Sequence, residues 1–220
     1  VREAIELHTD RKGKEAEARA IEMLTLVGVN EPEKRVKQYP YELSGGMRQR
    51  VMIAMALACE PDILIADEPT TALDVTIQAQ ILELMQSLQK KLGMAIIMVT
   101  HDLGVIADMC DEIIVMYGGR VCERGTAEDI FYRPHHEYTK GLLRSIPNVD
   151  RIGEKLIPIP GTPINLLNMP KGCAFCPRCE EAMKICIEEQ PPEMQMPDGH
   201  FASCWLNVKA AMEEEKGGRQ

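Results

Sequence analysis

Two adjacent carboxylates, Asp67 and Glu68, directly follow a short apolar run in the middle of the chain. The run, residues 63–66, has the length and composition of a strand buried on both faces of a parallel sheet. Open α/β sheets bind ligands beyond the carboxyl ends of such strands. Asp67 offers the oxygen ligands that Mg²⁺ prefers, and Glu68 can polarise a water for attack on a phosphoryl group. Two solvated acids at a turn are the alternative, which leaves the apolar run unexplained.

A histidine follows the next apolar run in the same way. Residues 95–99 are apolar, and Thr100 and His101 come directly after them. The carboxyl ends of neighbouring parallel strands meet at one edge of a sheet, so we expect His101 to lie beside Glu68. A single histidine in a chain is more often structural than catalytic, and its position after a strand is what favours a functional role.

Ser44, Gly45 and Gly46 precede a segment that favours helix, residues 47–58. Ser44 is a good N-cap because its hydroxyl accepts from a free amide in the first turn. The two glycines have no Cβ, so an anion can approach the backbone amides at the positive end of the helix dipole. The start of this helix therefore predicts a phosphate site, and an ordinary capped helix is the simpler alternative.

Other elements must position these groups. Residues 1–30 have a helical pattern that Gly28 ends, and Asp74 is the expected cap, worth about 1 kcal/mol, of a long helix that ends at Gly93. Its predicted buried stripe consists of Ile77, Ile81, Leu84 and Leu88. Further on we expect a hairpin, with strands 113–117 and 120–123 around two glycines. A capping box at Thr126 and Asp129 predicts a short helix before Pro134, and His135 and His136 are assigned to a surface loop.

Four motifs in this order resemble those of ATP-binding cassette (ABC) ATPases. LSGGMRQR (43–50) resembles the signature motif, ILIADE (63–68) the Walker B strand, TALD (71–74) the D-loop and VTHD (99–102) the switch-histidine segment. The phrases MRQRVMIAMALA and ADEPTTALDVTIQAQIL narrow the resemblance to ATPase subunits of oligopeptide and dipeptide importers. The resemblance implies an α/β fold, in which part of a P-loop NTPase core with a helical subdomain is followed by a small Cys-rich, irregular extension.

The same resemblance implies roles for named residues around ATP and Mg²⁺. ATP would lie between two subunits, where Asp67 positions Mg²⁺, Glu68 activates the attacking water and His101 stabilises the transition state. The residues that would bind nucleotide across the dimer interface are Ser44, Gly45, Gly46, Gln49 and Asp74. Asp74 would also communicate between the two subunits.

Composition bears on the domains and on the location. Prolines become frequent after residue 147 and periodicity disappears, so we expect a boundary near Asn148, with an ATPase portion (1–148), an extension (149–212) and a disordered tail (213–220). The net charge of −9 argues against a nucleic-acid partner, and we see no apolar stretch of about 18 residues that could span a membrane. The resemblance to importer ATPases implies a peripheral location at the cytoplasmic face of the plasma (inner) membrane.

The resemblance also implies partners. These are a second ABC ATPase subunit, as a homo- or heterodimer, two transmembrane permease subunits and, indirectly, an extracytoplasmic peptide-binding protein. Two alternatives are a soluble cassette ATPase outside transport and an importer of nickel rather than peptide. A third is a non-enzymatic binding module built on the Cys-rich region.

The sequence contains no GxxxxGK[ST] loop to hold the phosphates of ATP. In the family this loop precedes the signature motif. We therefore expect the chain to be the C-terminal part of a longer ATPase that does not bind ATP normally by itself. Without the strand that precedes the loop, the sheet would expose an edge prone to association.

Five of the eight cysteines cluster near the C-terminal end. Spacing alone favours a C-x₂-C-x₂-C run from Cys173 to Cys179, as in bacterial ferredoxins, with Cys186 or Cys204 as fourth ligand. The family pattern instead implies Cys173, Cys179, Cys186 and Cys204, with Cys176 as an extra or substitute ligand. Four thiolates suit a [4Fe–4S] cluster, which the resemblance implies, or Zn²⁺. Free thiols or a disulfide pair are the alternative, and the three scattered cysteines suggest a reducing compartment.

Overall fold

The computed structural model describes residues 1–71, 73–146 and 157–217, and the chain forms two compact units, Val1–Met109 and Cys110–Gln220. The boundary that composition suggests near Asn148 lies outside the described residues. The second unit begins at Cys110 because the hairpin that follows this residue belongs to the same sheet as the C-terminal strands.

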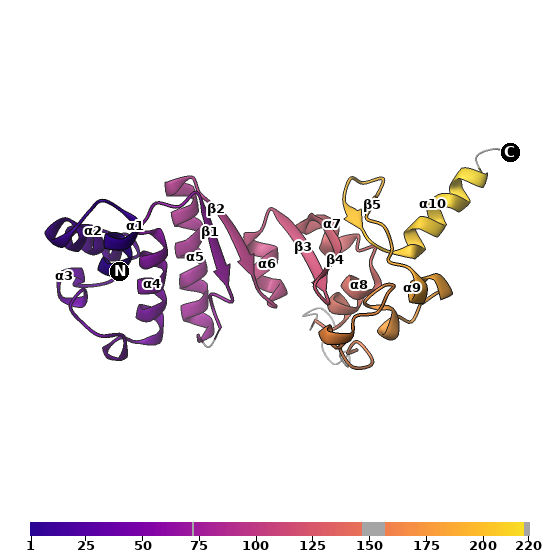
Figure 1. The fold of residues 1–220 in the computed structure, drawn as a ribbon, viewed down its shortest axis with the longest axis horizontal. Coiled ribbons are helices and arrows are strands. Elements are labelled where there is room, and N and C mark those ends of the chain that lie inside the picture. Colours follow the sequence, from indigo (N-terminus) through magenta and orange to yellow (C-terminus); the bar gives the residue numbers. More distant parts are fainter. Residues whose placement is uncertain (72, 147–156, 218–220) are drawn as a thin grey trace. The chain divides into compact units, whose positions relative to one another are not determined.

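Helices make up the N-terminal half of the first unit (Figure 1). They are α1 (Arg2–His8), α2 (Gly13–Leu26), α3 (Pro32–Arg35), the 3₁₀ turn η1 (Pro40–Glu42) and α4 (Gly45–Leu57). Gly28 follows the last turn of α2 with a φ of 72°, so the predicted glycine stop is confirmed. Apolar side chains of α2 and α4, among them Ala20, Leu24, Ile53 and Leu57, are buried in one core.

A parallel pair of strands carries the predicted site. β1 (Ile63–Asp67) pairs with β2 (Ala95–Val99) in a register that sets Asp67 opposite Val99. In the chain, α5 (Val75–Leu92) connects β1 to β2. It begins after the Asp74 cap and ends before Gly93, as predicted. The helix α6 (Leu103–Met109) follows β2.

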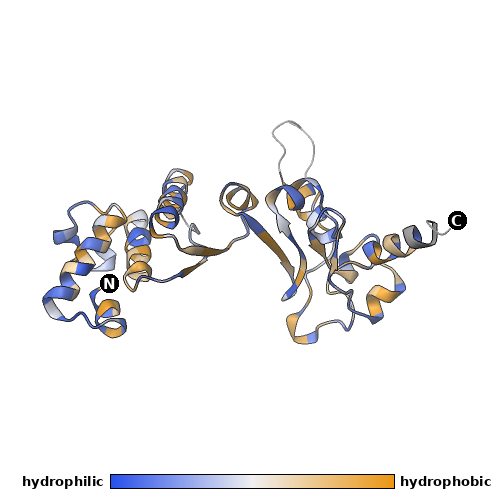
Figure 2. Cartoon of the chain, turned by 90° about the horizontal axis from the view of Figure 1, so that it is seen from above, coloured by the Kyte–Doolittle hydropathy of each residue, from blue (hydrophilic) through white to orange (hydrophobic). Residues whose placement is uncertain are grey.

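The prediction that residues 63–66 are buried on both faces is wrong for the described structure. Leu64 and Ala66 face the core, whereas Ile63 and Ile65 are 55% and 67% exposed. Alternate residues of a strand point to opposite faces, and α4 and α5 contribute their buried residues to the core on the Leu64 side only. In Figure 2 the ribbon of β1 is coloured as hydrophobic, although the side chains on one of its faces are exposed.

The second unit contains a four-stranded antiparallel sheet in the order β3-β4-β6-β5. β3 (Glu112–Tyr117) and β4 (Arg120–Thr126) form the predicted hairpin, and both turn glycines have positive φ values, as a two-residue turn of this kind requires. β5 (Met194–Gln195) and β6 (Phe201–Ala202) extend this sheet, with β6 paired to β4. The C-terminal segment is therefore joined to the hairpin by backbone hydrogen bonds.

Short helices surround this sheet. They are α7 (Ala127–Tyr132), α8 (Glu137–Arg144), the 3₁₀ turns η3 (Leu166–Asn168) and η4 (Cys176–Arg178), α9 (Lys184–Glu188) and α10 (Trp205–Gly217). The capping box of Thr126 and Asp129 is present at α7, as predicted. Since α10 continues through Gly217, part of the tail expected to be disordered is helical.

The assignment of His136 to a surface loop is wrong. His136 is 3% exposed and caps α8, where its Nδ1 accepts from the amide of Tyr138 at 3.0 Å. Burial lowers the pKa of His136 to about 4. A helix start can bury an imidazole when the ring supplies the missing acceptor for an end amide.

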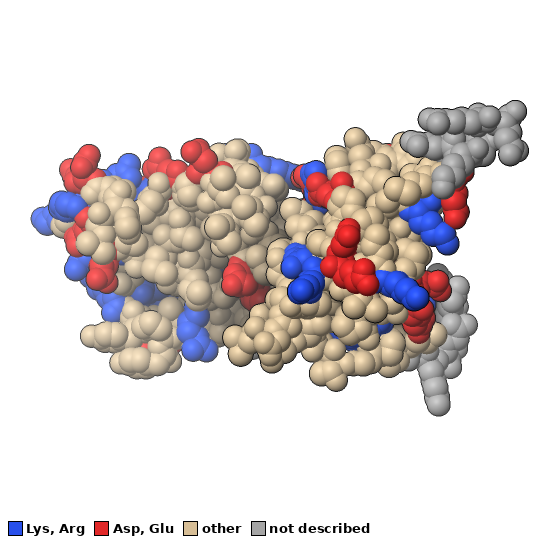
Figure 3. Space-filling view, turned by 45° about the vertical axis from the view of Figure 1, so that its right-hand side comes forward, with Lys and Arg blue, Asp and Glu red and all other residues tan. Residues whose placement is uncertain are grey.

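None of the helices in the described parts of the chain has both the length and the apolar character needed to cross a membrane. On the face drawn in Figure 3, lysine and arginine side chains are interspersed with aspartate and glutamate.

Candidate functional site

The structure brings Glu68 and His101 together at the carboxyl ends of β1 and β2. Glu68 Oε1 lies 2.7 Å from His101 Nδ1, and the hydroxyl of Thr71 donates to Glu68 Oε2 at 2.9 Å. The backbone of Glu68 has a left-handed φ of 47°, and its amide still donates to the carbonyl of Val99 at 2.8 Å. The side chain of His101 is 82% exposed and that of Glu68 38%, so both are open to a ligand.

Each member of this pair stabilises the charged form of the other. The hydrogen bond from His101, followed by that from Thr71, lowers the pKa of Glu68 below its usual range. The same hydrogen bond to Glu68 raises the pKa of His101. The result is an ionised carboxylate held by two donors at the end of a strand, with Asp67 exposed directly before it.

The start of α4 is an exposed, capped helix end. Ser44 Oγ accepts from the amide of Met47 at 3.4 Å, and Ser44 and Gly45 are both exposed. A Cβ on Gly45 would meet nothing closer than 3.8 Å, whereas a Cβ on Gly46 would lie 2.9 Å from Cγ2 of Ile77. Gly45 thus leaves the amides open to an anion, while Gly46 allows α4 to pack closely on α5.

The residues around this helix end include two cations. A cavity of about 300 Å³ is lined by Ser44, Gly46, Arg35 and Arg50 among others. The guanidinium of Arg50 also donates to the carbonyl of Val27 at 2.6 Å, which holds it in place. Anions are favoured where free helix amides and fixed guanidinium groups converge.

Two further predicted nucleotide-binding residues lie near this helix end. Asp74 is exposed and caps α5, because its Oδ1 accepts a hydrogen bond from the amide of Ile77 at 2.9 Å. Gln49 is half-buried on α4. Within the described part of the chain, no hydrogen bond or ion pair joins the Ser44 end of α4 to the Glu68–His101 pair.

All five C-terminal cysteines line one narrow pocket of the second unit. Cys173, Cys176, Cys179, Cys186 and Cys204 share it with His136, Phe175 and Trp205. All eight cysteines of the chain, each of which is described, are free thiols. Burial raises the pKa of Cys173, Cys176 and Cys204, and that of Cys179 to about 12. A cation in this pocket would therefore have to displace thiol protons.

Contacts of the backbone and of Trp205, which the sequence pattern gave no role, hold this region together. The amide of Cys173 donates to the carbonyl of Cys186 at 2.8 Å, which joins the two halves of the cysteine segment. Trp205 Nε1 donates to the carbonyl of Glu189 at 3.0 Å and fixes the segment that begins at Cys204. The one tryptophan next to a cysteine was the signal available in the sequence.

Comparisons with known proteins agree at both ends of the chain. Residues 1–71 match the family described as "ABC transporter", and residues 122–186 match that described as "Oligopeptide/dipeptide transporter, C-terminal region". A solved ABC transporter structure, described as metal-chelate type and inward-facing, shares the fold with a TM-score of 0.55 at 23% identity, over 64% of this chain and 55% of that one. This likeness concerns the fold, and together with the match of residues 1–71 it supports an ABC ATPase core.

Curated relatives align over most of the chain. It is 53% identical over 209 residues to the dipeptide transport ATP-binding protein DppD of Bacillus subtilis, covering 95% of this chain and 62% of the relative. It is 59% identical over 192 residues to the oligopeptide transport ATP-binding protein OppD of the same organism, covering 87% and 54%. The corresponding OppD of Salmonella typhimurium is 52% identical over 207 residues, covering 94% and 62%. The chain thus spans only 54–62% of the length of these relatives. Residues 1–71 and 122–186 thus match the ABC transporter family and the oligopeptide/dipeptide transporter C-terminal region, and the chain is similar to ATP-binding proteins named for dipeptide and oligopeptide transport.

Proposed function

We propose that this chain carries the signature, metal-binding and hydrolytic residues of an ATPase subunit that energises the import of di- or oligopeptides. The observation that carries the proposal is the 2.7 Å approach of Glu68 and His101 at the ends of two parallel strands. Relatives named for dipeptide and oligopeptide transport favour this function over nickel import and over a cassette ATPase outside transport.

In this proposal Glu68 is the general base. It takes a proton from water while the water oxygen bonds to the γ-phosphorus and the bond to the ADP oxygen breaks. Asp67 would hold Mg²⁺, which neutralises charge on the phosphates. While the two are paired, the hydrogen bond from His101 lowers the basicity of Glu68. When nucleotide is bound, His101 would instead bond to a γ-phosphate oxygen, and Glu68 would regain its basicity.

The start of α4 would act on a different ATP molecule from the one at Glu68 and His101. The exposed amides at the start of α4, framed by Ser44, Gly45 and Gly46, would donate to the γ-phosphate of ATP held by a second ATPase subunit, with Gln49 nearby. Asp74, the exposed cap of α5, would connect the two sites. The exposure of Ser44 and Gly45 supports such sharing.

The proposal implies an assembly. It consists of a second ABC ATPase subunit, two transmembrane permease subunits and, indirectly, an extracytoplasmic peptide-binding protein. The ATPase would be peripheral at the cytoplasmic face of the inner membrane.

The direct test is Glu68→Gln in the intact transport ATPase. The proposal predicts that turnover falls by ~10²–10⁴, the range for loss of a general base, while ATP affinity is kept. Glu83→Ala, an exposed change on α5, is the matched control. Turnover within a few-fold of normal in Glu68→Gln would remove Glu68 from this role.

We further propose that the cysteine pocket holds a structural [4Fe–4S] cluster through Cys173, Cys179, Cys186 and Cys204, with Cys176 as an extra or substitute ligand. Five free thiols around one pocket fit such a group. Among the described residues, no three of these sulfurs all lie within 4.8 Å of one another. Four thiolates suit a four-iron cluster, and Zn²⁺ is the alternative.

Anaerobic purification tests the cluster. Absorbance near 400 nm together with about four irons per chain is expected, and Cys186→Ser should abolish both. A colourless, iron-free but folded protein would contradict the cluster and leave the ATPase proposal intact.

A further inference from the structure

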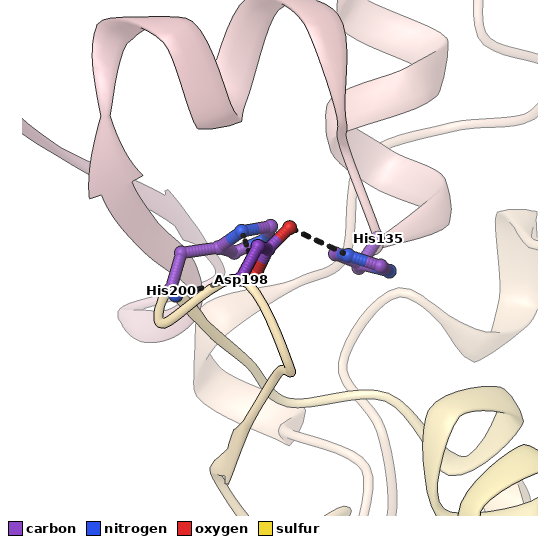
Figure 4. Close-up of side chains that lie close together, drawn as sticks. All are labelled: His135, Asp198 and His200. Carbon is purple, nitrogen blue, oxygen red and sulfur yellow. Dashed lines mark hydrogen bonds and ion pairs between the residues drawn. The ribbon is translucent and has the colours of Figure 1, made fainter.

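Three potential metal ligands from two distant segments meet on the second unit. The ligand atoms of His135, Asp198 and His200 all lie within 4.8 Å of one another. Asp198 Oδ1 is 3.0 Å from His200 Nδ1, and Asp198 Oδ2 is 3.6 Å from His135 Nε2. Figure 4 shows the carboxylate between the two imidazole rings. This group lies outside the cysteine pocket and has no role in the function proposed above.

The backbone holds these ligands in place. Asp198 and His200 belong to the turn between β5 and β6, where the amide of Met196 donates to the carbonyl of His200 at 2.8 Å and that of Gly199 donates to Met196 at 2.9 Å. His135 lies between α7 and α8. A buried carboxylate on β4, Glu123, accepts from the amides of both His135 and His136. The two segments are therefore fixed to the sheet independently of any ion.

Glu123 also determines which nitrogen of His200 is free. Its Oε1 lies 3.2 Å from His200 Nε2, and the side chains of both residues are completely buried. A proton on Nε2 satisfies this carboxylate and leaves the lone pair on Nδ1. His200 Nδ1 is buried and forms no hydrogen bond of acceptable geometry, although Asp198 is at ion-pair distance. Metal-binding histidines commonly have this arrangement, in which a carboxylate accepts from the second ring nitrogen.

The spacing suits a small tetrahedral site. Metal–ligand bonds of about 2.0–2.2 Å, as for Zn²⁺ with nitrogen and oxygen ligands, place neighbouring ligand atoms about 3.3–3.6 Å apart. The 3.6 Å from His135 Nε2 to Oδ2 of Asp198 agrees with this range, and the 3.0 Å from His200 Nδ1 to the other oxygen, Oδ1, is shorter. Two imidazoles and one carboxylate favour Zn²⁺ and similar transition metals over Mg²⁺ or Ca²⁺.

We propose that His135, Asp198 and His200 bind a divalent transition-metal ion of the Zn²⁺ type, with water as the fourth ligand. The ion ties the β5–β6 turn to the connection between α7 and α8. The partly exposed side chains of His135 and Asp198, 30% and 24% accessible, leave a path for the ion and its water.

The competing interpretation is a network of protonated histidines and carboxylates. One further cation is near, because Arg133 Nε lies 3.7 Å from Asp198 Oδ2. The guanidinium of Arg133 is already engaged by Asp129 at 2.5 Å, so it does not replace a ligand at His200 Nδ1. The two interpretations differ in whether a metal ion binds.

The test uses the full chain with every cysteine kept, in competition with a chromophoric chelator. The wild-type chain is expected to bind one more equivalent of Zn²⁺ than His135→Gln or Asp198→Asn. If the variants still bind that equivalent, the wild-type chain should bind it at least ~10-fold more tightly than they do. His8→Gln, which removes an exposed histidine of the other unit, should change neither quantity. Co²⁺ provides a second readout, because a site of nitrogen and oxygen ligands gives d–d bands without thiolate charge transfer.

Glu123→Gln tests the supporting carboxylate and should weaken Zn²⁺ binding by about 10–100-fold. Circular dichroism of each variant reports whether it folds. Equal Zn²⁺ content and affinity in wild type, His135→Gln and Asp198→Asn, or a Co²⁺ spectrum that shows only thiolate bands in the wild type, would overturn the site.

Discussion

Glu68 and His101 come from the ends of two hydrogen-bonded parallel strands, and 2.7 Å separates Oε1 of the first from Nδ1 of the second. The register that sets Asp67 opposite Val99 places both residues just past the sheet edge. Glu68 takes a left-handed backbone conformation to reach this position. Such conformations are costly for residues other than glycine and cluster at functional sites.

The pairing should be visible in the titration of His101. Glu68 raises the pKa of His101 above its ordinary value of 6.5, so the ion pair is complete below that pH and is lost as pH rises through the raised pKa. On the acid side, Glu68 has a lowered pKa, and the pair is lost only as pH falls through that lowered pKa. NMR titration of the His101 ring in the wild type measures the upper limit.

Two variants control this titration. Glu68→Gln removes the charge and should return the pKa of His101 toward its ordinary value, whereas Thr71→Val keeps the carboxylate and should leave the pKa of His101 raised. A wild-type His101 that titrates at or below 6.5 would show that the pair does not form in solution.

The two signature glycines should respond differently to alanine. Gly46→Ala should lower the free energy of unfolding by about 1–3 kcal/mol, because its Cβ overpacks against the stiff, β-branched Ile77. Gly45→Ala has room for its methyl group and should be neutral or stabilising by up to about 1 kcal/mol. Urea unfolding measures both. If Ile77 is the cause, Gly46→Ala combined with Ile77→Ala loses less than the sum of the single losses, and strict additivity would point elsewhere.

Asp74 should show a cap role that is separable from its interface role. Asp74→Ala is expected to cost about 1 kcal/mol of stability because the amide of Ile77 loses its acceptor. Asp74→Ser restores an acceptor and should recover most of that stability, and Glu83→Ala is the surface control. A role between subunits then appears as slow ATP turnover in the stable Asp74→Ser variant. Normal turnover in Asp74→Ser would limit Asp74 to capping.

The local devices of the chain could be predicted from its sequence because each is encoded within a few residues. The caps at Ser44 and Asp74, the glycine stop at Gly93 and the Gly118–Gly119 turn are of this kind. The nearness of Glu68 and His101 was also predictable, since parallel strands end at the same edge.

What the sequence could not predict depends on packing over long distances. Composition does not specify which face of β1 is covered, so the exposure of Ile65 was missed. Strands of two residues, such as β5 and β6, have no detectable period, so their pairing with β4 was not expected. The meeting of His135 with Asp198 follows from that pairing and was equally invisible.

The central claim, that Glu68 and His101 act on one phosphoryl group as a unit, is tested most directly by a double-mutant cycle on ATP turnover in the intact transport ATPase. Glu68→Gln and His101→Ala should each slow turnover by ~10²–10⁴, and the double variant should be about as slow as the slower single one, because residues that act as a unit are not additive. Losses that multiply in the double variant, or a near-normal rate in either single variant, would contradict the account.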